Sequence, residues 1–447
     1  MNYEVLKEQI AKAGIVGAGG AGFPTQFKLA KEMDYLIING AECEPLLYTD
    51  YQILTHFGKE LIDTLHELLE ICEIKQGIIG IKKKYNELIN TLRDYTQRYP
   101  EIHIQAVDNI YPVGDEVTLI YECTGRVIPR GELPASQKVV EINVETLLNI
   151  GRCLRNGEPV THTYMTVGGA VPNPKVVKAP IGIKVRELLK LIGIEDLEDK
   201  SILVGGPMMG QFGDLDTLIT KTTKGILILP QDHILHKLKG SPDMSTVKRA
   251  MSSCSQCRMC TDLCPRNRLG HKVEPHKVMN AIANGLTSHY EGIETALGCC
   301  GCNVCSYFAC HHELSPSKFM TLIKKELLAH GERGVKDLNP VPKKDIGTKV
   351  VASRLTSRIG LGQYDQKAQW DEITLVPSIV TISTRQHIGK KAKVLVQAGD
   401  QVEVGSLIAQ MDEEGISANI HASVTGKVLC VQEDQIIIES LDDKEGR

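Results

Sequence analysis

Nine of the fourteen cysteines fall within 57 consecutive positions, from Cys254 to Cys310. The other five are spread singly along the chain, as is usual for small buried apolar residues: Cys43, Cys72, Cys123, Cys153 and Cys430. Disulfides form in oxidising compartments, but the charged N-terminus MNYEVLKEQI lacks the apolar core of a secretory signal. In a reducing compartment, cysteines crowded this closely indicate metal binding. The sequence therefore predicts a cytoplasmic, metal-binding protein.

The crowded cysteines form two runs with defined spacing. The first is Cys254-x2-Cys257-x2-Cys260-x3-Cys264 followed by Pro265, and the second is Cys299-x2-Cys302-x2-Cys305-x4-Cys310. In two-cluster ferredoxins, three closely spaced thiolates bind one [4Fe–4S] cluster and the fourth cysteine of the run ligates the other cluster. We therefore predict two [4Fe–4S] clusters with crossed ligand sets. One set is Cys254, Cys257, Cys260 and Cys310, and the other is Cys264, Cys299, Cys302 and Cys305.

Two alternatives remain open for these cysteines. Cys300 could replace Cys299 as a ligand, although only Cys299 has the x2 spacing to Cys302. Two structural zinc sites would also use eight cysteines, but zinc sites favour pairs of cysteines over triplets with a trailing fourth. The spacing favours clusters. A thiolate-bound cluster carries electrons, so the rest of the chain should supply an electron source.

A second motif lies near the N-terminus. The segment GIVGAGGAGFPTQFK (14–28) has five glycines in the nine positions from Gly14 to Gly22, a density that lets backbone N–H groups approach a phosphate or a flavin edge. Taken alone, the motif is equally compatible with a flexible loop. It is followed by an apolar strand, YLIIN, and then by INGAECEP (38–45), which places Asn39, Glu42 and Glu44 past a strand end, where ligands collect in open α/β sheets.

The patterns of apolar and polar residues divide the chain into several predicted structural units. Alternating strand and helix patterns over about 14–150 predict helices on a largely parallel sheet, with strands at 35–39 and 77–82 and helices at 49–72 and 85–99. Residues 160–230 predict a compact β-rich unit with one helix, and about 244–330 a helical unit that carries the cysteines. The polar stretch 331–372 is predicted to be a linker with little core of its own. Residues 373–442 show two related hairpin patterns, which predict a small β sandwich or barrel.

Net charge and hydropathy argue against two classes of protein, those that bind nucleic acid and those that span a membrane. A chain of 447 residues with a net charge of −4 shows no basic footprint for nucleic acid, and no apolar run reaches the length that spans a bilayer. The composition, 42% apolar and 24% charged, is that of an ordinary globular protein. We therefore expect neither a nucleic-acid partner nor a membrane-spanning segment.

The motifs together resemble a known family. GAGGAGFPTQFK followed by NGAECEP resembles the FMN- and NADH-binding segment of the flavoprotein subunit of respiratory complex I. YPVGDEVTLIYECTGR (111–126) and INVETL (142–147) resemble that subunit's second and third nucleotide segments, in the same order. Over nearly the whole chain, the sequence is more similar to the RnfC family of Rnf-complex proteins, in its PduS-like branch of cobalamin reductases from propanediol-utilisation microcompartments. The segment 166–189 looks like a soluble-ligand-binding β-grasp domain.

This resemblance implies a fold class and domain boundaries. It implies a multidomain α/β plus β chain with a Rossmann-like FMN/NADH domain at 1–155 and a β-grasp domain at 156–240. A helical ferredoxin-like domain with two [4Fe–4S] clusters would follow at 241–332, then a linker at 333–372 and a C-terminal barrel-sandwich module at 373–447. The tail also resembles lipoyl and biotinyl carriers, but its central segment EEGISANIHASVTG has no lysine to modify, so a scaffold or docking role is favoured.

The resemblance also implies roles for individual residues. Glycines would line the flavin loop, Lys28 would lie near the FMN phosphate and Phe23 near the nicotinamide or flavin ring. The asparagines would bind the flavin ring or ribityl chain, and the glutamates would line the nucleotide cleft. The full set implied is Gly17, Gly19, Gly20, Gly22, Phe23, Lys28, Asn39, Glu42, Glu44, Glu116 and Asn143. The chain departs from the family at Ala41, where complex I has an acidic residue, which weakens the expectation for NADH more than for FMN.

The expected function is electron transfer from NADH through FMN and two [4Fe–4S] clusters to cobalamin or a cobalamin-carrying enzyme. The resemblance implies a place in a bacterial microcompartment with shell proteins as partners, and leaves a homo-oligomer open. One alternative is an RnfC-like electron-transfer protein that passes electrons to ferredoxin or to a membrane Rnf complex. Another, of a different class, is a zinc-stapled microcompartment scaffold without catalysis. Acidic Glu42 and Glu44 without a nearby arginine favour NADH over NADPH.

Overall fold

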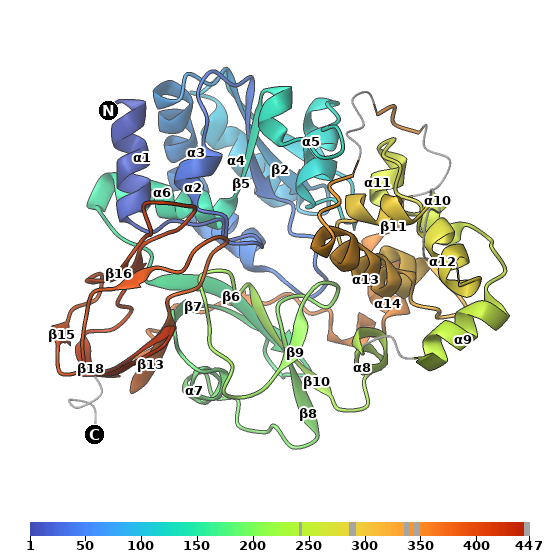
Figure 1. Cartoon of the computed structure of the whole chain (residues 1–447). Coiled ribbons are helices and arrows are strands. Elements are labelled where there is room, and N and C mark those ends of the chain that lie inside the picture. Colours follow the sequence, from blue (N-terminus) through green and yellow to red (C-terminus); the bar gives the residue numbers. More distant parts are fainter. Residues whose placement is uncertain (241–243, 286–291, 335–339, 344–348, 442–447) are drawn as a thin grey trace.

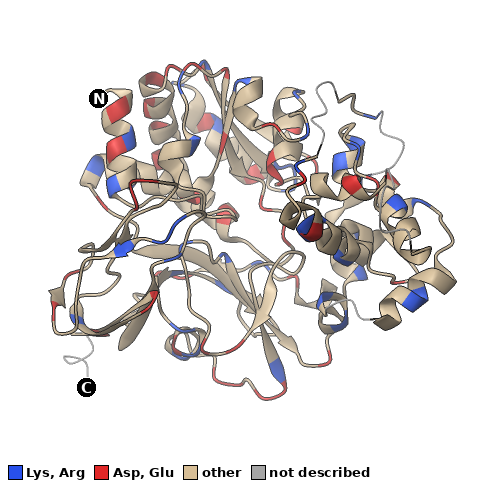
Figure 2. Cartoon of the chain, viewed as in Figure 1, with Lys and Arg blue, Asp and Glu red and all other residues tan. Residues whose placement is uncertain are grey.

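The computed structural model describes residues 1–240, 244–285, 292–334, 340–343 and 349–441. They form an N-terminal α/β domain, a β-rich middle domain, a helical cysteine-rich domain and a C-terminal β module (Figure 1). Acidic and basic residues are intermingled along the ribbon in Figure 2. Among the described residues, none of the helices combines the length and apolar character that a bilayer-crossing segment requires.

The N-terminal domain is built on a parallel sheet of four strands in the order β3-β2-β1-β5. The strands are β1 (Tyr35–Gly40), β2 (Gln76–Lys82), β3 (Ile102–Val107) and β5 (Val139–Asn143). The helices are α1 (Tyr3–Lys12), α2 (Thr25–Lys28), α3 (Thr49–Ile71), α4 (Asn86–Thr96), α5 (Glu116–Thr124) and α6 (Val144–Asn156). The predicted strands and helices of this region are confirmed.

Helices cover both faces of this sheet because the side chains of each strand alternate between two cores. Along β1, Leu36 and Ile38 pack into the core beneath α3 and α6, whereas Ile37 packs into the core beneath α5. All three are fully buried, which explains the uninterrupted apolar run of a strand covered on both sides. The parallel register also places Asn39 opposite Asn143, so both asparagines lie at the same edge of the sheet.

The middle domain has a mixed six-stranded sheet in the order β12-β7-β6-β10-β8-β9. Its strands are β6 (His162–Gly169), β7 (Lys175–Pro180), β8 (Lys200–Val204), β9 (Gln211–Gly213), β10 (Gly225–Pro230) and β12 (Gln369–Trp370), with helices α7 (Val185–Leu191) and α8 (Ile234–Lys239). The predicted β-rich unit with one helix over 160–230 is confirmed.

The cysteine-rich domain is helical, as predicted. Its elements are α9 (Met244–Ser253), α10 (Met259–Asp262), α11 (Pro265–Arg268), α12 (Pro275–Ala283), η2 (Ile293–Gly298), η3 (Cys305–Ala309) and α13 (Pro316–Ala329). Cys264 is the N-cap of α11 and Pro265 is its first residue, a position that tolerates the missing N–H of proline.

The C-terminal module consists of two small sheets that share their core with the N-terminal domain. One sheet has the order β13-β19-β18-β15 and the other β14-β16-β17. The strands are β13 (Ile379–Ser383), β14 (Lys393–Val394), β15 (Gln401–Val402), β16 (Leu407–Gln410), β17 (Ile420–His421), β18 (Gly426–Gln432) and β19 (Gln435–Ser440). Ile382 and Ile438 belong to the same apolar core as Leu6 and Ile10 of α1. The predicted β sandwich or barrel agrees with this arrangement.

The stretch predicted as a linker differs from expectation. Within its described residues, β11 (Val350–Val351) pairs with β4 (Ile110–Tyr111), and α14 (Ala352–Arg358) follows. Leu355, Ile359 and Leu361 are fully buried. Further on, Trp370 in β12 stacks on Tyr164 and His56. The prediction of a segment with little core was wrong, because a few well-spaced apolar residues suffice to pack a polar stretch against existing domains.

We predict that Leu355→Ala lowers the free energy of unfolding by about 2–5 kcal/mol, since it leaves a cavity in a fully buried site. Urea unfolding followed by circular dichroism measures this. Leu133→Ala, at a side chain that is 75% exposed, is the control and should change stability by less than about 0.5 kcal/mol. Equal effects of the two substitutions would mean that 349–370 contributes no core.

Candidate functional site

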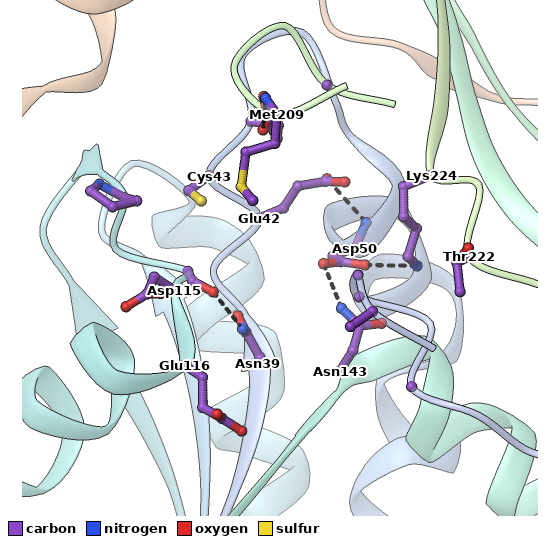
Figure 3. A pocket seen from close by; sticks show the side chains of 18 of the residues that line it. Asn39, Glu42, Cys43, Asp50, Asp115, Glu116, Asn143, Met209, Thr222 and Lys224 are labelled. Carbon is purple, nitrogen blue, oxygen red and sulfur yellow. Dashed lines mark hydrogen bonds and ion pairs between the residues drawn. The ribbon is translucent and has the colours of Figure 1, made fainter. Parts of the chain in front are cut away.

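A cavity of about 630 Å³ lies where the N-terminal, middle and cysteine-rich domains meet. Its volume is in the range typical of sites for small ligands and cofactors. All eleven residues implied by the sequence as cofactor-binding line it: Gly17, Gly19, Gly20, Gly22, Phe23, Lys28, Asn39, Glu42, Glu44, Glu116 and Asn143. Figure 3 shows how polar side chains from the strand ends and from the middle domain converge on this space.

The glycine-rich loop (residues 14–23) forms one wall of the cavity. Its base is closed by a hydrogen bond from the N–H of Gly17 to the carbonyl of Phe23 at 2.9 Å, and the N–H of Ala18 donates to Oγ1 of Thr146 at 3.0 Å. Within the described residues, the N–H groups of Gly19, Gly20 and Ala21 have no protein acceptor. A Cβ on Gly20 would meet no atom within 4 Å. The loop therefore offers open space and free donors to an anionic or flavin-like group.

At the edge of the sheet below this loop, one lysine pairs with two carboxylates. Lys28 Nζ lies 2.8 Å from Glu116 Oε1 and 2.9 Å from Glu141 Oε2. Burial disfavours its charge, but the carboxylates of Glu141 and Glu116 outweigh this effect and raise the pKa of Lys28. Asn39 Nδ2 donates to Glu141 Oε1 and to the carbonyl of Gly114, both at 2.9 Å. Lys28 is thus already paired with two carboxylates, and its predicted contact with a phosphate stays a prediction.

A second polar group joins the N-terminal and middle domains. Asn143 Nδ2 donates to Asp50 Oδ2 at 2.9 Å, and Lys224 Nζ of the middle domain lies 3.3 Å from Asp50 Oδ1 (Figure 3). Lys224 also pairs with Glu145. Burial, followed by the charge of Asp50, raises the pKa of Glu42 well above its ordinary value. A carboxyl that keeps its proton can donate a hydrogen bond to a ligand in the cavity.

Glu44 lines the cavity, where the sequence places it, and also makes contacts that the sequence did not predict. Its two carboxylate oxygens accept the backbone N–H groups of Met208 and Met209, at 2.8 and 2.9 Å. A Cβ on Gly206 would lie 2.3 Å from this carboxylate, so the approach requires glycine. Glu44 therefore lines the cavity and also holds the middle-domain loop 205–210 in place as part of the cavity wall.

The structure gathers the cysteines into two groups. Cys254, Cys257, Cys260 and Cys310 line one small cavity of about 30 Å³, and burial, followed by the other three thiols, raises the pKa of Cys260 to about 12. Five thiols gather in the other group, namely the predicted set Cys264, Cys299, Cys302 and Cys305 together with Cys300, so the structure does not choose between Cys299 and Cys300. These groups contain the sets that the spacing predicts, and their role as ligands stays a prediction. In the described part of the chain, no three His, Cys, Asp or Glu side chains are placed to bind a single metal ion.

The second group adjoins the main cavity. Cys300 and Cys302 form part of the cavity lining, and the hydroxyl of Tyr111 donates to the carbonyl of Cys302 at 3.0 Å. Two residues after Cys264, Arg266 makes a bidentate pair with Asp115, at 2.6 and 2.9 Å. Asp115 caps α5 and lines the same cavity. The arrangement places the second group of cysteines directly beside the main cavity.

Sequence reasoning missed several residues of this site, among them Asp50, Asp115, Glu141 and Lys224. Only Glu141 carried a usable signal: a carboxylate within the apolar strand VVEIN must be buried, and buried charges are paired. Lys224 lies in the segment TKTTKG, which matches no motif. Its role depends on contacts between domains that are distant in sequence.

Comparison with known families agrees with this site. Residues 10–152 match the Nuo51 FMN-binding domain, residues 253–315 match a 4Fe-4S dicluster domain, and residues 363–442 match the RnfC barrel sandwich hybrid domain.

Whole-chain relatives were also found. The chain is 36% identical over 440 residues to the cobalamin reductase PduS of Salmonella typhimurium, covering 98% of this chain and 97% of that protein. It is 36% identical to the PduS of Citrobacter freundii over 436 residues, covering 97% and 96%. The RnfC-type component of the Na(+)-translocating ferredoxin:NAD(+) oxidoreductase complex of Acetobacterium woodii is 33% identical over 272 residues, which are 59% of this chain and 58% of that one.

We predict that Lys224→Met lowers the free energy of unfolding by about 3–5 kcal/mol near pH 7.5, because it leaves buried carboxylates without their cation. The loss should shrink as the pH falls toward 5, because burial raises the pKa of Glu42, whose charge Lys224 also offsets, and protonation of Glu42 removes negative charge that the variant cannot balance. Thermal unfolding at both pH values measures this. Lys184→Met, which breaks an exposed pair with Asp216, is the control and should cost less than about 1 kcal/mol. A pH-independent loss in Lys224→Met would contradict the electrostatic explanation.

Proposed function

The chain belongs to the PduS cobalamin reductase family, and from this premise we propose that it transfers electrons from NADH, through FMN and two [4Fe–4S] clusters, to a corrinoid. The matched FMN-binding and 4Fe-4S domains make it an oxidoreductase. The main support for this electron path is one cavity of about 630 Å³. It is lined by every candidate flavin residue and also by Cys300 and Cys302 of the cysteine-rich domain.

The residues of the cavity suit FMN. Free N–H groups on Gly19, Gly20 and Ala21 would hold its phosphate or ring edge, and Asn39 and Asn143 flank the sheet edge where the ring system would lie. FMN, when bound, supplies two-electron exchange with a nicotinamide and one-electron exchange with clusters. The protein holds the cofactor in position: Asp50 and Glu141 orient the two asparagines, and loop 205–210 forms part of the cavity wall.

NADH is the proposed donor. Both lysines that line the cavity, Lys28 and Lys224, are paired with carboxylates, and no arginine is among its described lining residues. A 2′-phosphate would require a free cation. The acidic surroundings therefore favour NADH over NADPH.

The two thiolate quartets differ in depth, which supports an order of electron transfer. The quartet that contains Cys264 adjoins the cavity, whereas the quartet that contains Cys257 reaches the surface, since Cys257 is exposed. Cys305 of the inner quartet interacts with Cys260 of the outer one, and η3 contacts α10. We propose that electrons pass from the inner to the outer quartet and leave the protein there.

The proposed acceptor is cobalamin, because the PduS proteins match almost the full length of the chain. By the same relationship, a microcompartment interior with shell proteins as neighbours is the proposed location. The middle domain, as a β-grasp fold, is the proposed contact for the corrinoid. Transfer to ferredoxin is the second candidate, since the Acetobacterium woodii protein matches 59% of the chain at 33% identity.

The direct test is anaerobic purification followed by counting of cofactors. We expect one FMN and about eight irons per chain, and flavin absorbance that NADH bleaches. Hydroxocobalamin should then reoxidise the protein faster than ferredoxin does. A colourless protein that holds zinc would overturn the proposal. Faster reoxidation by ferredoxin than by hydroxocobalamin would identify ferredoxin, not cobalamin, as the acceptor.

The cysteine ligands can be tested separately. Cys299→Ala should reduce the iron content from about eight to about four per chain, because it removes one ligand of the inner cluster. Cys300→Ala should leave the content unchanged, as should the distant control Cys430→Ala. Iron and sulfide analysis of anaerobically prepared protein measures this. The reverse outcome would assign the ligand to Cys300.

A further inference from the structure

We propose that the C-terminal module supports the glycine-rich loop of the flavin site from outside the cavity, and that Lys221 is the positioning residue that ties this loop to the module. This inference rests on the proposed function, since it takes the cavity to hold FMN. It assigns the module a role in cofactor binding, in place of the scaffold or docking role expected from its sequence.

Lys221 joins three parts of the chain at one point. It comes from the middle domain, and its side chain is buried. Its Nζ donates to the carbonyl of Gly14, at the start of the glycine-rich loop, and to the carbonyl of Asn419, in the C-terminal module, both at 2.7 Å. The backbone N–H of Lys221 donates to Oε1 of Gln386 in the same module, at 3.0 Å.

Further contacts run directly between the loop region and the module. The N–H of Ile388 donates to the carbonyl of Gly22 at 3.3 Å, and Gln26 Nε2 donates to the carbonyl of Ser417 at 3.2 Å. Gly22 has φ of +67°, and a Cβ there would lie 3.0 Å from the carbonyl oxygen of Gln386. Both ends of the loop are therefore held by the module, while the free donors at 19–21 face the ligand space between them.

The chemistry of Lys221 favours a positioning role over simple packing. In the described part of the chain it has no carboxylate partner, and burial lowers the pKa of Lys221 to about 7. Burial lowers the pKa of His387 and, to about 3, the pKa of His421, both of which interact with Lys221, so these rings are neutral near pH 7 and supply no negative charge to balance the amine. Burying an amine without a counter-ion costs free energy. In return, Lys221 donates a hydrogen bond to each of two backbone carbonyls, those of Gly14 and Asn419, that would otherwise be unsatisfied. A loop held in its binding conformation loses less entropy when a ligand binds.

The test measures FMN affinity of the full-length, cluster-containing chain after flavin removal, by titration with FMN under anaerobic conditions. Lys221→Met removes both Nζ hydrogen bonds with a similar volume, and we expect FMN to bind about tenfold more weakly. Gln26→Met removes one bond, outside the cavity lining, and should weaken binding about fivefold. Lys190→Met, on the exposed face of α7, is the matched control and should bind like the unsubstituted chain.

Two further readouts separate positioning from a general loss of structure. The visible circular dichroism of the bound flavin should change in Lys221→Met at saturating FMN, while the iron content stays at the control value. FMN affinity within about twofold of the control in Lys221→Met would overturn the inference. If Lys221→Met does not fold, the FMN affinity of Gln26→Met is used instead, and an affinity within about twofold of the control would again overturn the inference. If the unsubstituted chain binds no FMN, the proposed function fails, not the role of Lys221 alone.

Discussion

A half-buried ion pair between Arg266 and Asp115 ties the cysteine-rich domain to the wall of the cavity. Arg266 follows Cys264 by two residues, and Asp115 caps the helix α5 at the edge of the flavin-sized cavity. A bidentate guanidinium–carboxylate contact fixes both distance and orientation. Because the pair connects a cysteine run to a cavity wall, the inner thiolate quartet cannot shift without displacing the cap of α5. Pairs of this kind contribute more to specific geometry than to net stability.

The cavity is assembled from several domains, and its polar residues serve mainly to hold those domains in place. Lys224 links the middle domain to Asp50 and Glu145, and Glu44 holds the loop 205–210 through two backbone N–H groups. On the opposite side, the glycine-rich loop is fixed by the C-terminal module. These contacts leave only a few donors free for a ligand, chiefly the N–H groups at 19–21.

The sequence predicted those parts of the site that depend on local pattern. Asn39 could be predicted because it follows a strand end, Asn143 because the segment INVETL resembles a known family, and the cysteine sets because their spacing is short and regular. Lys224 and Arg266 could not, since their partners lie 79 to 174 residues away in the sequence and no motif marks them. The stretch 349–370 was misjudged because its few apolar residues, such as Leu355, pack against other domains instead of forming a core of their own.

The central claim is that the cavity and the inner quartet form one redox unit. A crystal structure of the anaerobically prepared protein, with anomalous scattering recorded at the iron edge, tests this most directly. Our account predicts FMN in the cavity beside Cys300 and Cys302, one iron peak enclosed by the quartet that contains Cys264, and a second enclosed by the quartet that contains Cys257. Flavin bound elsewhere, or anomalous signal from zinc instead of iron at the thiolates, would contradict it.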